Sequence, residues 1–294
     1  MDQRFPEDLH PILSENQPLQ DSLWLGIGGP ARFLARPRCF DEVVQLCKAA
    51  KAAGIAVRML GQGSNVLVRE AGFDGLVILL TESETAGLRI EADTLIAGAG
   101  AKLNDAVIET VGAGLAGLEH LVGIPGSIGG AVVGNVSAEG RDIGSAVRAI
   151  EVIDEQGERR QIPAEEAGFA HRKSTLSGLV VLQVTFGLEK KDLQALTKRM
   201  QKLWIHRGQR RPTDSPRIAM PFIDPDTISA RELILQTGLA GVREGNVSLD
   251  SSEPHYLIAH EGATSEQCLT LVARVREQVL LQTGIDLQLN LQIW

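Results

Sequence analysis

Apolar and polar positions alternate in the α/β manner over the first 80 residues. Apolar side chains recur on one face between residues 43 and 50, which predicts a helix with Asp41 as its N-cap and Gly54 just beyond its end. Three short apolar runs predict strands at 55–60, 66–68 and 76–80. Strands this close together leave no room for a crossover helix between them.

The pattern of apolar positions changes between residues 88 and 188, where short apolar runs flank a glycine-rich segment. Short apolar runs predict strands at 95–97, 149–153 and 179–188, with a helix near 104–111. Between them lies a segment that is very rich in glycine, from 123 to 131. Glycine permits a positive φ and a close approach of the backbone, so this density predicts a tightly folded segment that faces a ligand.

The last third begins with a predicted helix over 192–206. Four prolines between 212 and 225 make the stretch 213–225 largely irregular. Thr264 and Gln267 form a capping box for the final helix, which Gly284 ends, and the tail from 285 to 294 alternates like a terminal strand. These changes predict three domains, over residues 1–85, 86–190 and 191–294.

Composition and charge exclude several classes of function. With 44% hydrophobic and 22% charged residues the chain is globular, and its net charge of −8 disfavours nucleic acid as a partner. Its three cysteines are scattered, so neither a disulfide framework nor a metal site is predicted. The N-terminus has no signal-peptide pattern and the apolar runs are too short for a membrane span. We therefore expect a soluble cytoplasmic protein that is not in a membrane.

The first candidate for chemistry is the loop that follows the strand predicted at 55–60. It reads Gly61, Gln62, Gly63, Ser64, Asn65, and its glycines expose backbone N–H groups that can form an anion-binding nest. It lacks the Lys of a phosphate-binding P-loop and the third Gly of a dinucleotide fingerprint. The alternative is an ordinary hairpin turn between two strands.

The glycine-rich segment is the second candidate. Its proposed binding residues are Gly123, Ile124, Pro125, Gly126, Ser127, Gly129 and Gly130, with Asn135 just beyond them. Two separate nests, each between apolar strands, fit a long ligand that carries several phosphates or polar rings. His120 lies beside this segment, where a core histidine and a residue near the ligand are both open readings.

Three segments together resemble the UDP-N-acetylenolpyruvoylglucosamine reductase (MurB) family, in its shorter form. They are Ile27-Gly28-Gly29, the run from Leu60 to Val68, and Gly117-Leu118-Glu119 running into 123–131. The resemblance implies an α+β protein, with an FAD-binding fold of the MurB / vanillyl-alcohol-oxidase type in two α/β subdomains and a C-terminal α+β domain for substrate. It implies FAD held by the two nests and Asn135, NADPH as the electron donor and a UDP-sugar as the substrate.

The family's catalytic segments are altered in this chain. The family reduces an enolpyruvyl group and protonates the neighbouring carbon, using a Ser in a Gly-Ser-x-Phe-Lys-Asn-Pro segment, an Arg and a late Glu. Aligned on these segments, the Arg is Arg172, the proton-donor position holds Met220, the Lys position holds Ile223 and the late Glu falls at Asn290. A thioether has no proton to give.

These replacements leave three hypotheses open. Loss of a general acid costs ~10²–10⁴ in rate, so the first is a flavoprotein in which the usual reduction is lost or changed. The second is an active reductase that uses His171, beside Arg172, as the acid, because an imidazole can donate a proton at neutral pH; Asp224 is a weaker candidate. The third is a binding or scaffold protein without catalysis.

Overall fold

The computed structural model describes residues 4–212, 215–225 and 227–294. These residues form two compact units. Unit 1 comprises residues up to Glu15, Phe33–Gln62 and Gly75–Gln209, and unit 2 comprises Asn16–Arg32, Gly63–Asp74 and Arg210–Trp294. Each unit is built from segments that lie far apart in the sequence. The three-domain division expected from the sequence stays a prediction.

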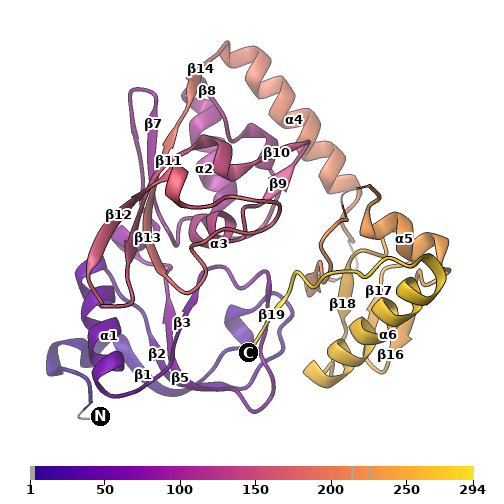
Figure 1. The fold of residues 1–294 in the computed structure, drawn as a ribbon, viewed down its shortest axis with the longest axis horizontal. Helices are drawn as coiled ribbons and strands as arrows, with labels where there is room; N and C mark the ends of the chain where they lie inside the picture. The colour runs from indigo at the N-terminus through magenta and orange to yellow at the C-terminus, as the bar shows by residue number, and fades with distance from the viewer. Residues whose placement is uncertain (1–3, 213–214, 226) are drawn as a thin grey trace. The chain divides into compact units, whose positions relative to one another are not determined.

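A four-stranded sheet and one helix make up the N-terminal part of the fold. The sheet has the order β1-β2-β5-β3, with β1 over Leu13–Pro18, β2 over Pro30–Ala35, β5 over Phe73–Leu79 and β3 over Val57–Leu60. Helix α1 runs over Phe40–Ala52 and buries one face in the same core (Figure 1). Its N-cap is Cys39, not Asp41, because Cys39 is the last residue with extended backbone and Asp41 already lies in the first turn.

Strands β3 and β5 are parallel neighbours, in a register that pairs Val57 with Leu76. The chain between them contains β4, over Val66–Leu67, which pairs in parallel with β19, over Gln292–Ile293. Since β3 and β4 do not pair with each other, the loop from Gly61 to Asn65 is not a hairpin turn. The absence of a helix between these strands agrees with the sequence prediction.

A five-stranded antiparallel sheet forms the larger layer of unit 1. Its order is β12-β11-β13-β7-β6, with β12 over Arg159–Pro163, β11 over Val147–Ile153, β13 over Val180–Gly187, β7 over Thr94–Gly98 and β6 over Leu88–Glu91. The strands predicted at 95–97, 149–153 and 179–188 are thereby confirmed. Helix α3, over Ile128–Val133, packs against β7 and β13 (Figure 1).

The remaining elements of unit 1 complete its core. Helix α2 covers Leu103–Gly112 and contacts α4, over Leu193–Gln209. The short strands are β8 (Leu115–Ala116), β9 (Ser137–Ala138), β10 (Arg141–Asp142) and β14 (Glu189–Lys190), and the 3-10 helices are η1 (Glu7–Ile12), η2 (Gln20–Ser22, in unit 2), η3 (Ser83–Ala86), η4 (Glu119–Leu121), η5 (Ile143–Ala146) and η6 (Ala164–Glu166). One buried cluster runs through both sheets, from Phe5 to Leu196.

Unit 2 has its own core around a second antiparallel sheet. The order is β15-β18-β17-β16, with β15 over Ile218–Ala219, β18 over Leu257–Ala259, β17 over Val247–Leu249 and β16 over Arg243–Glu244. Helices α5, over Ala230–Gln236, and α6, over Ser265–Thr283, contact each other, and α6 packs on the sheet (Figure 1). The capping box of Thr264 and Gln267 and the left-handed Gly284 after α6 are confirmed.

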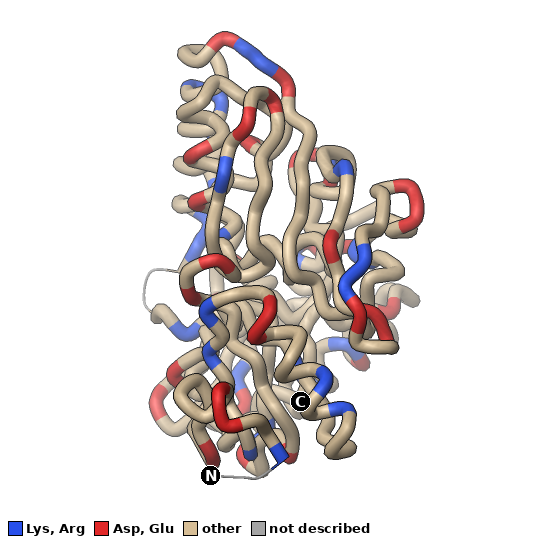
Figure 2. The backbone as a smooth tube through the Cα atoms, turned by 90° about the vertical axis from the view of Figure 1, so that its left-hand side faces the viewer, with Lys and Arg blue, Asp and Glu red and all other residues tan. Residues whose placement is uncertain are grey.

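One prediction for the C-terminal third needs correction. The tail forms a strand only at β19, because residues before it bond to the segment at 221–223 through the bridge between Phe222 and Leu289 instead of joining a sheet. The stretch predicted to be largely irregular is so over its described residues 215–225, apart from the short strand β15, and its residues Thr213 and Asp214 lie outside the described residues. No helix among the described residues is both long and apolar enough to cross a membrane. Lys and Arg are interspersed with Asp and Glu along the backbone (Figure 2).

Candidate functional site

The loop from Gly61 to Asn65 presents a run of unpaired backbone donors. None of the five N–H groups from Gly61 through Gln62, Gly63 and Ser64 to Asn65 has a hydrogen-bond partner among the described residues. Backbone donors left unpaired by protein are commonly satisfied by water or a ligand, and consecutive ones make a concavity that suits an anion. Within unit 1, the N–H groups of Gly61 and Gln62 are therefore available to a ligand, and the role of the whole loop in binding a phosphate stays a prediction.

The two predicted loops meet within unit 1. A Cβ atom placed on Gly61 would lie only 2.7 Å from the Cβ of Ser127, and closer still to its Oγ. Glycine is required at position 61 because any side chain there would overlap Ser127. The residues 61–62 and 127, which are far apart in sequence, thus belong to one local surface.

In the second loop the unpaired donors are concentrated at its centre. Gly123 and Gly126 both have a positive φ, of 76° and 127°. The N–H groups of Gly126 and Ser127 have no hydrogen-bond partner among the described residues, whereas that of Ile124 bonds to the Leu121 carbonyl at 3.1 Å. Gly126 and Ser127 are the donors that this segment can offer to a ligand, and Pro125 has none to offer.

The later glycines of this segment have structural contacts. The N–H of Gly129 donates to the Ala99 carbonyl at 2.7 Å, and a side chain on Gly129 would meet the Ala99 Cβ at 2.8 Å. The N–H of Gly130 donates to the Oγ of Ser127, the N-cap of α3. Their observed contacts position α3 against β7, and their role toward a ligand stays a prediction.

Asn135 is fully buried and its amide is used within the protein. Its Nδ2 donates to the Ala170 carbonyl at 2.8 Å and to Asp142 at 3.3 Å, and its Oδ1 accepts from the Gly144 N–H at 3.0 Å. Asn135 has a positive φ of 40°, which the short polar side chain tolerates. It joins the end of the glycine-rich segment to the strand turn that carries His171, and a flavin contact for it remains a prediction.

His171 and Arg172 occupy the tip of a two-residue turn. Ala170 and Lys173 exchange backbone hydrogen bonds of 2.9 and 3.2 Å, which closes the turn. Arg172 adopts a φ of 56°, a left-handed conformation that costs about 1 kcal/mol for a residue other than glycine. His171 is exposed and Arg172 is half-buried. Strain of this kind at a polar tip is typical of functional turns.

In unit 2 the structure brings together the predicted residues Met220 and Asn290. The Nδ2 of Asn290 donates to the Met220 carbonyl at 3.0 Å, and its backbone N–H donates to the Pro221 carbonyl at 2.8 Å. The Nδ2 of Asn65 donates to the Asn290 carbonyl. The segments placed in register by the family resemblance are therefore neighbours, and the side chains at positions 220 and 290 are a thioether and an amide.

Two buried titratable residues, Glu119 and His120, lie beside the second loop. His120 has no exposed surface and neither ring nitrogen has a hydrogen-bond partner among the described residues. Burial, followed by the nearby charge of Arg141, lowers the pKa of His120 to about 4, so the imidazole is neutral at pH 7. His120 is thus a core histidine, but not a hydrogen-bonded one.

Glu119, next to it, is held ionised. Burial acts to raise the pKa of Glu119, but the hydrogen bond from the Gly117 N–H at 2.7 Å and the charges of Arg199 and Arg141 outweigh it. The net result is a pKa below the usual range. A cavity of about 450 Å³ opens beside this carboxylate, between Arg141, Arg199 and Lys191.

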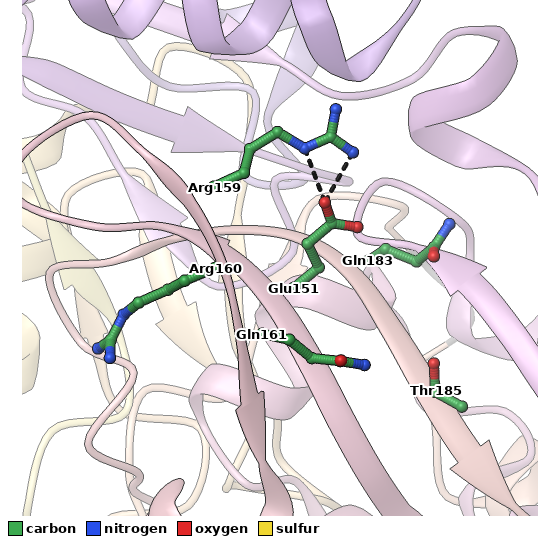
Figure 3. A pocket seen from close by; sticks show the side chains of 6 residues that line it. All are labelled: Glu151, Arg159, Arg160, Gln161, Gln183 and Thr185. Atoms are coloured by element: carbon green, nitrogen blue, oxygen red, sulfur yellow. Dashed lines mark hydrogen bonds and ion pairs between the residues drawn. The ribbon is translucent and has the colours of Figure 1, made fainter.

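A second hollow of about 280 Å³ lies on the five-stranded sheet and contains none of the predicted site residues (Figure 3). Arg159 donates to one oxygen of Glu151 from both Nε and Nη2, at 2.7 and 2.6 Å. The hollow is also lined by Arg160, Gln161, Gln183 and Thr185. No cluster of three or more metal-ligating side chains occurs among the described residues.

The sequence did not reveal two residues, Asn104 and Arg207, whose side chains hold the backbone of the second loop and of the residues just before it. The Oδ1 of Asn104 accepts the N–H of Gly123 at 2.9 Å, and Arg207 donates to the carbonyls of His120 and Val122. These partners lie 19 and more than 80 residues away in sequence. No local pattern marks such partners, so only the fold could reveal them.

Comparison with known proteins agrees with this arrangement. Residues 31–162 match the family described as "FAD binding domain", and residues 211–294 match "UDP-N-acetylenolpyruvoylglucosamine reductase, C-terminal domain". The UDP-N-acetylenolpyruvoylglucosamine reductase of Rhodopirellula baltica is 72% identical over 290 residues, which is 99% of this chain and 95% of that protein. This chain belongs to the UDP-N-acetylenolpyruvoylglucosamine reductase family. FAD is accordingly its cofactor.

Other members of the family and a wider fold group extend the comparison. The reductase of Moorella thermoacetica is 34% identical over 95% of this chain and 92% of its own length. The crystal structure of the reductase from Thermus caldophilus superposes with a TM-score of 0.82 at 31% identity, covering 95% of this chain and 98% of that one. A cholesterol oxidase with a TM-score of 0.51 and 19% identity, covering 65% of this chain and 40% of that one, shares the fold alone. The predicted fold, α+β with FAD-binding architecture of the vanillyl-alcohol-oxidase type, is confirmed.

Proposed function

We propose that this protein is an FAD-dependent oxidoreductase of the UDP-N-acetylenolpyruvoylglucosamine reductase family in which reduction of the enolpyruvyl sugar is lost or changed. The observation that carries the proposal is a contrast between two groups of residues. The cofactor half comprises the loops at 61–62 and 123–131 in unit 1, and the substrate half comprises Met220 and Asn290 in unit 2. The donors suited to a cofactor diphosphate are unpaired, whereas the aligned proton-donor position holds Met220. A protein altered in this way keeps its cofactor and loses a chemical step.

The cofactor half rests on the N–H groups of Gly61, Gln62, Gly126 and Ser127. They lack protein partners among the described residues, and Gly61 lies against Ser127 in unit 1. A diphosphate bears negative charge on several oxygens, each able to accept from a backbone N–H. FAD, when bound, supplies the redox chemistry, and NADPH is its proposed electron donor.

The substrate half rests on the side chains of unit 2. Met220 cannot donate a proton, and Asn290 can donate a hydrogen bond but cannot exchange a proton at neutral pH. Both N–H-bearing groups of Asn290 are directed at main-chain carbonyls. Loss of the acid costs ~10²–10⁴ in rate, and loss of an electrostatic stabiliser costs roughly 10²–10³.

A second candidate function keeps the reductase active with His171 as the proton donor. It is favoured by the exposure of His171 at a strained turn beside Arg172. The turn is also tied to the glycine-rich segment, since Asn135 donates to the Ala170 carbonyl. Histidine is the side chain that enzymes use most often to transfer protons.

The experiment compares product formation in four FAD-loaded proteins: the wild type, Met220→Ser, His171→Ala and Met200→Ser. The substrates are NADPH and the UDP-enolpyruvyl sugar, and the product measured is UDP-N-acetylmuramate. We expect negligible turnover in the wild type and a gain of roughly tenfold or more in Met220→Ser. Met200→Ser, the same change at a half-buried position of α4, should behave like the wild type.

The proposal fails if the wild type forms product at a rate that Met220→Ser does not raise. If that activity also disappears in His171→Ala, the second candidate is the correct function. Because all four proteins are compared at equal FAD content, a difference in cofactor loading cannot imitate either result.

A further inference from the structure

Helix α4 is attached to unit 1 by little apolar surface. Among its seventeen residues only Leu196 is buried, and Trp204 is 60% exposed. The helix carries no Asp or Glu, but several Lys and Arg. One of these, Arg207, differs from an ordinary surface cation, because only 21% of its side chain is exposed.

The guanidinium of Arg207 donates hydrogen bonds to the backbone just before the second cofactor loop, which is the glycine-rich segment 123–131. Its Nη2 donates to the His120 carbonyl at 2.7 Å, and its Nη1 donates to the Val122 carbonyl. Glu139 lies within ion-pair distance, at 3.8 Å. The side chains of His120 and Val122 are buried, so without Arg207 these two carbonyls would lose charge-assisted hydrogen bonds in a poorly hydrated place.

Two side chains of α4, those of Trp204 and Arg207, also lie close to Gly123. A Cβ on Gly123 would meet Trp204 Cδ1 at 3.5 Å and Arg207 Cδ at 3.8 Å. Gly123 has a φ of 76°, and its N–H is fixed by Asn104 of α2. The loop is therefore supported by α2 on one side and by Arg207 and Trp204 on the other.

These contacts do not use the two N–H groups at the centre of the loop, those of Gly126 and Ser127. The Gly126 carbonyl accepts from the Leu103 N–H at 3.0 Å, while the N–H groups of Gly126 and Ser127 lack partners among the described residues. A rigid backbone that holds unpaired donors binds an anion without a cost of ordering. Movement at Val122 would pass along three or four residues of backbone to these donors, and movement at His120 along five or six.

We propose that Arg207 is a positioning residue for the cofactor, acting through the carbonyls of His120 and Val122 on the donors at Gly126 and Ser127. The proposal rests on the proposed function, in which these donors hold the diphosphate of FAD. The observed hydrogen bonds of Arg207 go to the carbonyls of His120 and Val122, so in this proposal it acts on the cofactor through the loop backbone. Lysine replaces it only in part, since an ammonium lacks the planar fork that reaches two carbonyls.

The test uses the full chain with FAD removed and added back. Arg207→Met, Arg207→Lys and the control Lys198→Met, an exposed cation of the same helix, are compared with the wild type. The first measurement is the dissociation constant of FAD, from the change in flavin fluorescence. The second is the ³¹P NMR spectrum of the bound diphosphate, which a purely structural role of Arg207 would leave unchanged.

We expect Arg207→Met to weaken FAD binding by roughly 10- to 100-fold and to shift the diphosphate resonances. Arg207→Lys should lie between Arg207→Met and the wild type, and Lys198→Met should match the wild type within about twofold. If Arg207→Met does not fold, Arg207→Lys decides the question alone. FAD affinity and ³¹P resonances equal to those of the wild type in a folded Arg207 variant would overturn the proposal.

A fourth variant separates this proposal from the proposed function. Gly61→Ala places a methyl group against Ser127 and disturbs the loops directly. If Gly61→Ala loses FAD and the Arg207 variants do not, the loops hold the diphosphate but Arg207 does not position them. If Gly61→Ala binds FAD as the wild type does, the proposed cofactor site itself is wrong.

Discussion

Replacing Gly61 with alanine perturbs the place where the two cofactor loops touch. The new Cβ would lie 2.7 Å from the Cβ of Ser127. Carbon atoms normally approach to about 3.5 Å, so the loops must separate by roughly 0.8 Å or more. Overpacking of this kind costs about 1–3 kcal/mol, and in the proposed cofactor site it moves the unpaired donors on both sides away from the diphosphate. We expect the FAD dissociation constant to rise by roughly 10²-fold.

The assay is titration of the FAD-free protein with FAD, followed by flavin fluorescence. Gly134→Ala is the matched control, because its φ is negative and a Cβ there meets its nearest neighbour at 3.4 Å. The double variant Gly61→Ala/Ser127→Gly removes the overlap and should regain most of the affinity, less the loss of the α3 N-cap, about 1 kcal/mol in stability. Wild-type affinity in Gly61→Ala, or no recovery in the double variant, would refute the reasoning.

Three further predictions concern stability, measured by urea denaturation of the FAD-free protein. The pKa of His120 is lowered from 6.5 to about 4, so the unfolded chain binds more protons between these values and stability falls as pH drops through this window. The loss between pH 7 and pH 5 should be about 2 kcal/mol larger in the wild type than in His120→Phe, and equal losses would contradict it. Asn135→Ala should lower the free energy of unfolding by about 3 kcal/mol, since it leaves the Gly144 N–H and the Ala170 carbonyl unpaired; a loss below ~1 kcal/mol would be inconsistent with the buried network. Thr264→Ala removes one half of the α6 capping box and should cost about 1 kcal/mol, with no effect expected if the helix end is frayed.

Local patterns were sufficient for α1, α2, α4 and α6 and for several strands of unit 1, but they did not predict β1, β2 or the four-stranded sheet of unit 2. The capping box at Thr264 and the glycine after α6 are short-range signals, and they appear in the structure as the sequence predicts. The N-cap of α1 was misplaced by two residues, because Asp41 has the chemistry of a cap but Cys39 has the backbone geometry. Element boundaries depend on such geometry, which residue type alone does not determine.

Long-range partners explain what the sequence could not provide. Whether Gly61–Asn65 is a hairpin or a nest depends on which strands pair, and β3 pairs with β5 while β4 pairs with β19. The backbone contacts of Arg207 and the internal bonds of Asn135 likewise join residues distant in the chain. Met220 and Asn290 were placed in register by resemblance, and their hydrogen bond in unit 2 follows from the fold.

In the proposed function, the protein binds FAD that NADPH can reduce, but the residues of unit 2 do not complete the usual reduction of the sugar nucleotide. An anaerobic absorbance experiment tests it directly, with NADPH added first to the FAD-loaded protein and the UDP-enolpyruvyl sugar added second. We predict that NADPH bleaches the visible absorbance of the flavin and that the sugar nucleotide does not restore it. Return of the flavin absorbance on addition of the sugar nucleotide, with formation of UDP-N-acetylmuramate, would contradict the claim.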